Sequence, residues 1–174
     1  MGREQIGKAA GRLRAVGAGY AGDSERPLGS YGGILAAYAS MTALLGMRAR
    51  HRLPERVAAG DLALMTVAVF RASRLVTKDS VTAVARAPFT EFEAPAGEGE
   101  VTEAVAGRGL RHAVGELVTC PFCVAVWLGT VIAFGLVLAP RATRLACAIL
   151  TAVTGSDLLQ FGYSAVRRRE QQGG

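Results

Sequence analysis

The sequence predicts an all-α integral membrane protein, folded as a bundle of transmembrane helices. Half of the 174 residues are hydrophobic although one fifth are charged, and the mean hydropathy is positive. The two kinds of residue are segregated: residues 28–47 and 117–139 contain no charged side chain. A helix needs about 20 mainly apolar residues to cross a hydrocarbon core of ~30 Å. A soluble bundle would have to keep one face of such a helix wet, so a membrane location is favoured.

Four segments are candidates for the spans, and we expect four spans rather than three. The first, residues 28–47, and the third, residues 117–139, are uncharged throughout. The second, residues 57–76, is apolar but holds Asp61, Arg71 and Arg74, and the fourth, residues 145–166, is interrupted only by Asp157. In the three-span alternative, residues 57–76 lie in the membrane interface.

The remaining segments are polar. We expect residues 1–27 to form a mobile basic tail that either touches anionic lipid or is simply solvated. Residues 77–116 are expected to form an acidic, Pro- and Gly-containing cytoplasmic loop, and residues 167–174 a basic C-terminal tail. Residues 28–166 are then the transmembrane domain.

The distribution of cations predicts the orientation in the membrane. With four spans, the N-terminal tail, the 77–116 loop and the C-terminal tail share one side and carry more Lys and Arg than the other side. The positive-inside rule therefore predicts a multi-pass protein of the cytoplasmic membrane with both termini inside. Four arginines after the first span argue the other way, namely Arg48, Arg50, Arg52 and Arg56. In the three-span alternative these arginines would lie in the cytoplasm and the N-terminal tail outside. Both the four-span and the three-span arrangements place the start of the span 117–139 at the cytoplasmic face.

A C-x-x-C pair, Cys120 and Cys123, stands at the start of the third span with Pro121 between the cysteines. Three interpretations remain open. The pair could be a redox site, although such a membrane enzyme needs its thiols on the oxidising face. It could bind a metal, but structural zinc takes four ligands, so a dimer would have to supply both cysteines twice. The third interpretation is that both cysteines are small packing residues.

Arg71, Arg74 and Lys78 recur at helical spacing and form one stripe at the end of the second span. The stripe either anchors the helix at the headgroups or contacts an anionic group, such as a lipid phosphate, because Arg binds such groups in a bidentate manner. Asp79 would help to hold it.

Asp157 lies deep in the fourth span. A lone carboxylate inside the membrane is costly, so we expect it to face the bundle and to form an ion pair with Arg71 or Arg74. The alternative is a site that carries protons or ions.

The joint pattern of these residues resembles the DUF1360 family of small bacterial membrane proteins of unknown function, some associated with sporulation. The resemblance covers about residues 60–165 and rests on the run from Phe70 to Asp79, on Arg86-x-Pro88-Phe89, and on residues 115–123 followed by Trp127. The residues that match the motif are Arg71, Arg74, Asp79, Cys120, Cys123 and Trp127. The resemblance implies no catalytic residue. The high Ala, Gly and Arg content would suit an actinobacterial source.

These observations predict a non-enzymatic envelope or scaffold protein. The resemblance to the DUF1360 family implies that its role is developmental or related to sporulation. The alternative is a membrane thiol oxidoreductase or a metal-thiolate protein that uses Cys120 and Cys123. No nucleotide-binding, metalloprotease or serine-hydrolase motif occurs. We expect no cofactor, with zinc as the alternative. The expected partners are the lipid bilayer, anionic headgroups, and a second copy or another membrane protein, but not nucleic acid, because the cations flank apolar spans.

Overall fold

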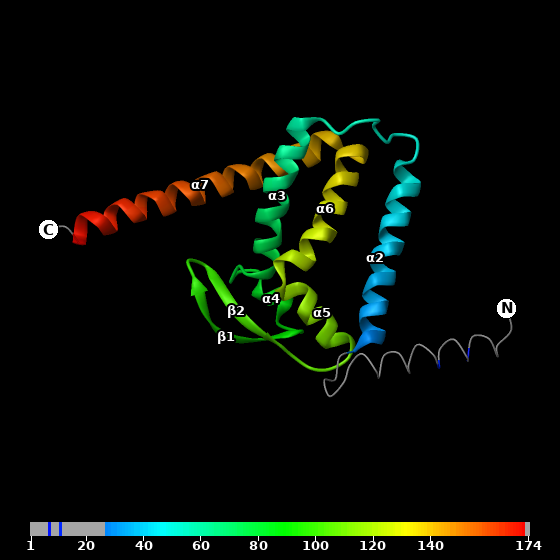
Figure 1. The fold of residues 1–174 in the computed structure, drawn as a ribbon, viewed down its shortest axis with the longest axis horizontal. Coiled ribbons are helices and arrows are strands. Elements are labelled where there is room, and N and C mark those ends of the chain that lie inside the picture. Colours follow the sequence, from blue (N-terminus) through cyan, green and yellow to red (C-terminus); the bar gives the residue numbers. More distant parts are fainter. Residues whose placement is uncertain (1–6, 8–10, 12–26, 173–174) are drawn as a thin grey trace.

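The computed structural model describes residues 27–172 together with Gly7 and Gly11, so almost all of the expected N-terminal tail lies outside the described residues. Six helices and two strands follow one another along this part of the chain (Figure 1). They are α2 (Leu28–Ala49), α3 (Ala59–Thr77), α4 (Ala83–Arg86), β1 (Thr90–Gly97), β2 (Glu100–Val105), α5 (Leu110–Thr119), α6 (Pro121–Leu138) and α7 (Pro140–Gln172).

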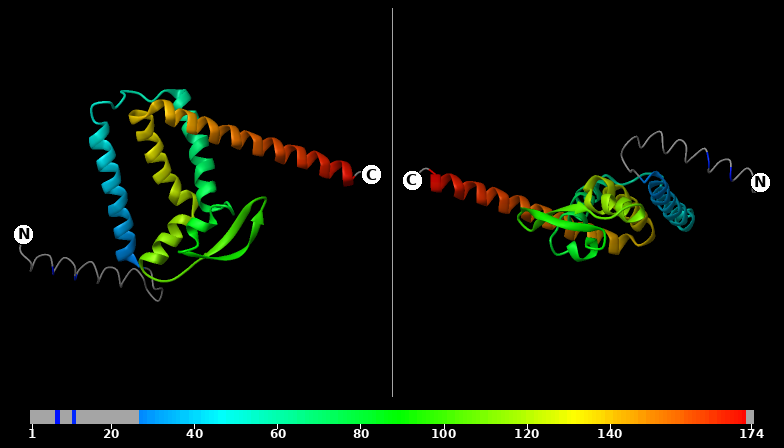
Figure 2. Two further views of the ribbon diagram at one scale, coloured as in Figure 1. Left: turned by 180° about the vertical axis from the view of Figure 1, so that it is seen from behind. Right: turned by 90° about the horizontal axis from the view of Figure 1, so that it is seen from below.

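The helices α2, α3 and α6 lie side by side, with α3 antiparallel to the other two (Figure 1). α6 contacts both α2 and α3, and α3 also packs against α7. The start of α2, the end of α3 and the start of α6 therefore lie at one end of the molecule, together with the strands. The 50–58 loop and the turn between α6 and α7 lie at the other end. α7 leaves that end at a steep angle to the other helices and projects from the body of the molecule (Figure 2).

Among the described residues, three helices are long and apolar enough to cross a membrane: Leu28–Ala49, Pro121–Leu138 and Pro140–Gln172. α3, which corresponds to the expected second span, is not among them, and it carries Asp61, Arg71 and Arg74. The side chains buried within the described residues are mostly small, such as Ala49, Ala68, Ala72 and Ala113, whereas large apolar side chains of α2, α6 and α7 point outward. Close packing of small residues with apolar side chains on the outside is what a lipid environment permits.

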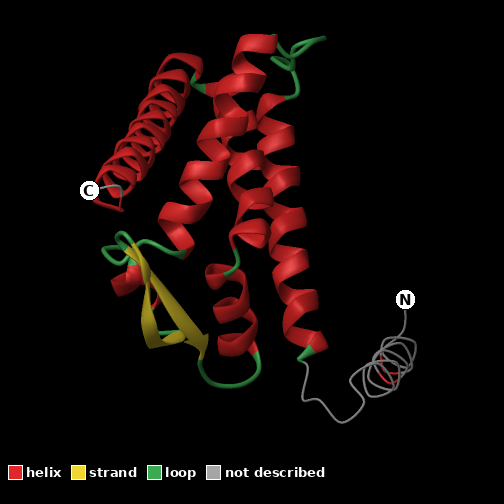
Figure 3. Ribbon diagram, turned by 60° about the vertical axis from the view of Figure 1, so that its left-hand side comes forward, coloured by secondary structure: helices red, strands yellow, loops and turns green. Residues whose placement is uncertain are grey.

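The expectation of an all-α chain is wrong between residues 90 and 105, where β1 and β2 form an antiparallel two-stranded sheet (Figure 3). The register runs from Thr90 opposite Val105 to Gly97 opposite Glu100, with two irregularities. The turn between the strands is possible because Gly97 and Gly99 adopt positive φ angles, which side chains disfavour. The segment 77–116 is thus a folded region rather than a loop. We call residues 78–119, which include α4, the hairpin and α5, the cap.

The uncharged run 117–139 is not one helix, because the chain breaks at Cys120 between α5 and α6. Cys120 has an extended backbone, with φ −101° and ψ 107°. The pyrrolidine ring of the following Pro121 clashes with a helical conformation at the residue before it, and Pro121 itself fits the first turn of a new helix. The break separates the cap from the apolar helix α6.

The last helix is longer than the expected fourth span of 145–166. α7 begins at Pro140 and continues to Gln172, so the basic residues expected to form a tail lie in its final turns.

Candidate functional site

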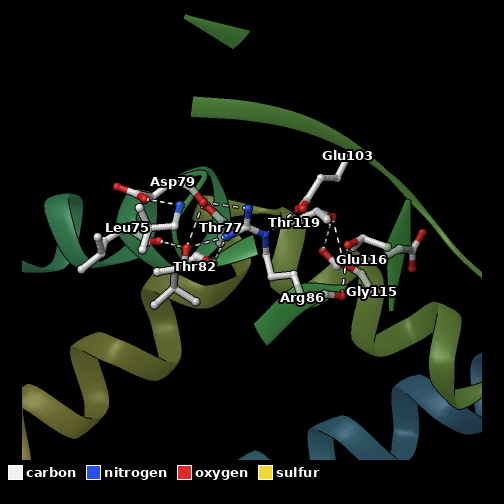
Figure 4. Close-up of polar contacts among 12 residues, drawn as sticks. Leu75, Thr77, Asp79, Thr82, Arg86, Glu103, Gly115, Glu116 and Thr119 are labelled. Carbon is white, nitrogen blue, oxygen red and sulfur yellow. Dashed lines mark hydrogen bonds and ion pairs between the residues drawn. The ribbon is translucent and has the colours of Figure 1, made fainter. Parts of the chain in front are cut away.

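A buried arginine holds the cap together. The side chain of Arg86 is only 2% exposed, and its guanidinium donates hydrogen bonds in three directions (Figure 4). Nη1 donates to the carbonyl oxygen of Val76 (2.8 Å) and to Oγ1 of Thr82 (2.7 Å), and Nη2 donates to the carbonyl oxygen of Asp79 (3.0 Å). These acceptors lie at the end of α3 and in the turn that follows it, so Arg86 fixes the direction in which the chain leaves α3.

The same guanidinium also holds the hairpin. Nε of Arg86 donates to Oε2 of Glu103 at 2.5 Å, and the Glu103 side chain is 6% exposed. The backbone oxygen of Arg86 accepts a hydrogen bond from Oγ1 of Thr90 at the start of β1. Arg86 thereby joins the end of α3, α4 and both strands into one unit. Sequence reasoning did not pair these two residues, although Arg86 belongs to the run Arg86-x-Pro88-Phe89 that carries the family resemblance.

Gly115 brings α5 into close contact with this unit. A Cβ at that position would lie 2.7 Å from the carbonyl oxygen of Phe89 and 2.6 Å from Cγ1 of Val105. The glycine therefore allows α5 to pack directly on the hairpin, and it fixes the place where α6 begins.

A polar cleft opens between α3, the tip of the hairpin and the middle of α7. The cavity measures about 540 Å³. Its lining includes charged residues from all three elements, namely Arg71, Arg74, Asp79, Glu98, Glu100 and Asp157. Apolar side chains, among them Phe70 and Phe161, complete its wall.

Two ion pairs cross this cleft. Nη1 of Arg71 lies 3.2 Å from Oδ2 of Asp157, which links α3 to α7. Arg74, one turn further on the same face of α3, donates from Nε (3.0 Å) and Nη2 (2.5 Å) to the two carboxylate oxygens of Glu100 at the hairpin tip. The structure thus brings Asp157 to Arg71 and gives Arg74 a partner, Glu100, that sequence reasoning missed.

These pairs change the charge of the expected anion site. The cleft holds two arginines and four carboxylates, so an anion at Arg71 or Arg74 would have to displace Asp157 or Glu100. Lys78, the third residue of the stripe, does not line the cleft. It is bound through its backbone, because its carbonyl oxygen accepts from the N–H of Val101 in β2 (2.9 Å).

Asp79 stabilises the turn after α3. Its Oδ1 accepts a hydrogen bond from the backbone N–H of Val81 at 2.8 Å, and its backbone pairs with Glu100 in an isolated antiparallel bridge. Asp79 therefore stabilises the connection between α3 and the hairpin.

The two motif cysteines lie away from the cleft, at the start of α6. The Sγ atom of Cys120 accepts a hydrogen bond from the backbone N–H of Cys123 at 3.3 Å, so Cys120 caps the helix. Both cysteines are free thiols. Within residues 27–172 no group of three or more His, Cys, Asp or Glu side chains lies close enough together to hold a metal ion.

The last motif residue, Trp127, packs in an apolar groove between α2, α5 and α6. Its ring meets that of Tyr38 edge to face, with centroids 5.2 Å apart, and the hydroxyls of Tyr38 and Thr130 are 2.8 Å apart. The groove measures about 400 Å³ and includes Cys123. At its cap end the hydroxyl of Tyr31 donates to Glu116. These contacts attach α2, which lies outside the expected motif region, to the rest of the bundle.

A known protein family matches the part of the chain that contains the cap, α6 and the residues of the cleft. The family described as a protein of unknown function (DUF1360) matches residues 64–163, which run from α3 through the cap and α6 to the last residues of the cleft on α7. A sporulation protein of Bacillus subtilis (strain 168), YjcA, is 35% identical over 69 residues, which cover 38% of this chain and 58% of the relative. The matched part thus spans less than two thirds of that relative. No solved structure matches. Because the family match extends over more than half of the sequence, the chain belongs to the DUF1360 family, whose function is unknown.

Proposed function

We propose that this chain is a non-enzymatic scaffold protein of the cytoplasmic membrane, with its cap in the cytoplasm, and that it works during sporulation. The observation that carries the proposal is that both arginines of the cleft form ion pairs with carboxylates from other elements. Arg71 pairs with Asp157 of α7, and Arg74 pairs with Glu100 of the hairpin. A general acid or base has to exchange protons with a substrate, whereas these groups hold α7 and the hairpin against α3.

The buried pair of Arg86 and Glu103 supports a structural role for the cap as well. It makes the hairpin a rigid surface at one end of the helices, although an isolated two-stranded hairpin is marginally stable in water. Every residue of β1 after Thr90 is exposed, among them Glu91, Phe92 and Glu93. A rigid and exposed hairpin at the membrane surface is suited to contact a second copy or another membrane protein.

The arrangement of the helices supports α3 as a span beside α2 and α6. α3 is antiparallel to α2 and α6 and lies between the same two ends, so a bilayer that α2 and α6 cross would also contain α3 (Figure 1). The cap would then face the cytoplasm with the N-terminal tail, as the positive-inside rule requires. The proposed sporulation role rests on the family and on the similarity to the Bacillus subtilis protein.

Complementation can separate the scaffold from a thiol enzyme. The full chain would be expressed in Bacillus subtilis that lacks its sporulation protein YjcA, and heat-resistant spores would be counted. Wild type and the double variant Cys120→Ser/Cys123→Ser should both restore the count. Arg71→Asp and Asp157→Arg should each fail, because each leaves two like charges facing each other, and the combined swap should recover.

Three results would contradict the proposal. A strain without YjcA that forms resistant spores at the normal level would speak against the sporulation role. Loss of complementation in the cysteine double variant, with the charge variants active, would favour the thiol oxidoreductase. Labelling of a single cysteine at Glu93, in a chain otherwise free of cysteine, by an impermeant maleimide added outside the cell would reverse the orientation.

A further inference from the structure

A second charged cavity lies at the end of the molecule opposite the cap, where the 50–58 loop meets the ends of three helices. It measures about 310 Å³, within the usual range for ligand sites of about 300–1,000 Å³. Arg52 and Arg56 from the loop and Arg144 from α7 line it, and Asp61 of α3 is its one carboxylate. With three guanidinium groups and one carboxylate, the cavity has a formal charge of +2, whereas carboxylates outnumber arginines in the cleft near the cap.

The carboxylate of this cavity, Asp61, already forms an ion pair with Arg144. Nε and Nη2 of Arg144 both donate to Asp61, at 2.7 Å each, so the two planar groups face each other in a bidentate pair. The pair fixes the guanidinium plane of Arg144 and leaves Nη1 without a partner among the described residues. The Arg144 side chain remains 53% exposed, so its remaining donors are open to a ligand.

The other two arginines, Arg52 and Arg56, form no side-chain hydrogen bond or ion pair within residues 27–172, and both are exposed. α3 begins beside them at Ala59 without a side-chain cap, so its first backbone N–H groups add positive potential at the same place. Three guanidinium groups and a helix start converge here without enough carboxylates to neutralise them.

The opposite wall of the cavity is apolar. Met65 of α3 and Ala133, Leu136 and Val137 of α6 form it, and α6 is the most apolar of the candidate spans. A cationic rim over an apolar floor, at the end of membrane helices, fits a ligand that is itself divided into an anionic head and an apolar chain.

We propose that this cavity binds the phosphate group of an anionic phospholipid, with Arg52, Arg56 and Arg144 around the phosphate and the acyl chain along α3 and α6. Arginine suits this ligand because its planar donors match phosphate oxygens and are weakly hydrated. The site explains the arginines of the 50–58 loop, which the positive-inside rule alone would place on the other side. It goes beyond the scaffold function and requires only that the helices lie in a membrane.

The test uses the purified full chain in a zwitterionic detergent, with thermal stability as the readout. Dioleoyl phosphatidylglycerol, dioleoyl phosphatidylcholine and inorganic phosphate would be titrated separately. Phosphatidylglycerol should raise the melting temperature in a saturable manner, and phosphatidylcholine and inorganic phosphate should do so little. The double variant Arg52→Gln/Arg56→Gln should require at least tenfold more phosphatidylglycerol for half of the effect.

Arg141→Gln is the matched control, because Arg141 lies at the same end of α7 but does not line the cavity. It should leave the titration unchanged. The proposal is overturned if the double variant responds like wild type, or if Arg141→Gln weakens the response equally, since the effect would then be general surface charge. Equal protection by inorganic phosphate would show a soluble-anion site and overturn the lipid assignment. Because sporulation is not measured, the proposed scaffold function is unaffected by any of these results.

Discussion

Replacement of Arg86 by alanine should open the cap while the helices remain assembled. The variant leaves the Glu103 carboxylate, 6% exposed, without its partner, together with the carbonyl oxygen of Val76. Removal of one member of a buried ion pair typically costs about 3–5 kcal/mol. At about 1.4 kcal/mol per tenfold change, the equilibrium for opening the cap should rise by roughly a hundredfold to a few thousandfold.

Hydrogen–deuterium exchange in lipid nanodiscs measures this change locally. Backbone amides of β1 and β2 should exchange faster by about that factor, whereas those of α2 and α6 should keep their rates. Arg111→Ala is the control: this arginine also lies in the cap, but it is exposed and makes one hydrogen bond, from Nε to the carbonyl oxygen of Pro88. Its loss should cost about 1 kcal/mol or less.

A second variant separates buried charge from lost packing. Arg86→Met combined with Glu103→Leu removes both charges and should recover part of the loss, because no buried charge is then unpaired and the carbonyl oxygen of Val76 is the main group that lacks a partner. If Arg86→Ala left the exchange of the hairpin unchanged, or if the double variant were as open as the single one, the role assigned to this ion pair would be wrong.

Three further substitutions test other contacts. Gly115→Ala should destabilise the protein by about 1–3 kcal/mol, seen as a lower melting temperature, because its Cβ would overlap the carbonyl oxygen of Phe89; Gly60→Ala, which meets nothing within 4 Å, should not. Arg74→Gln should speed exchange only at the hairpin tip and cost at most about 1 kcal/mol, since the pair with Glu100 is partly exposed; a global effect would contradict this. Tyr38→Leu should change the fluorescence of the single tryptophan, which it contacts edge to face, and an unchanged spectrum would show that the two rings do not meet.

The apolar segments could be predicted from the sequence because long uncharged runs have few other uses. The residues at which the helices begin and end were harder to predict. The break at Cys120 follows from Pro121, whose effect on the preceding residue is local and was visible, but hydropathy alone merges α5 and α6 into one run. The length of α7 could not be predicted from hydropathy, because the charged residues near both of its ends, among them Arg141, Arg144 and Arg167, limit only its apolar part and not the helix.

The hairpin could not be predicted from composition, because its strands are acidic and contain Pro95 and Gly97. Its stability comes from contacts with distant segments: the N–H of Val101 donates to Lys78, the N–H of Ser80 donates to Gly99, and Arg86 holds Glu103. Only the turn had a local signal, the two glycines that flank Glu98.

Because the hairpin could not be predicted, the sequence also left open which arginine pairs with Asp157. Sequence reasoning offered Asp157 two partners, Arg71 and Arg74, which lie on the same face of a helix. In the structure Arg74 is taken by Glu100, a residue of the unpredicted turn, and Arg71 is left for Asp157. Choosing between neighbouring arginines required knowledge of a segment whose fold depends on tertiary contacts.

In the membrane location that we propose, the length of α7 has a consequence for the surrounding bilayer. At 1.5 Å per residue, its 33 residues extend about 50 Å, whereas the hydrocarbon core is only ~30 Å thick. α2 and α6, with 22 and 18 residues, match that thickness when upright. α7 does not, so it must either lean far over within the same bilayer or carry its last turns, with Arg167, Arg168 and Arg169, out among the headgroups. A strongly inclined helix beside upright ones occupies a wide footprint and disturbs the order of neighbouring acyl chains, so the lipids next to α7 should differ in thickness from those next to α2.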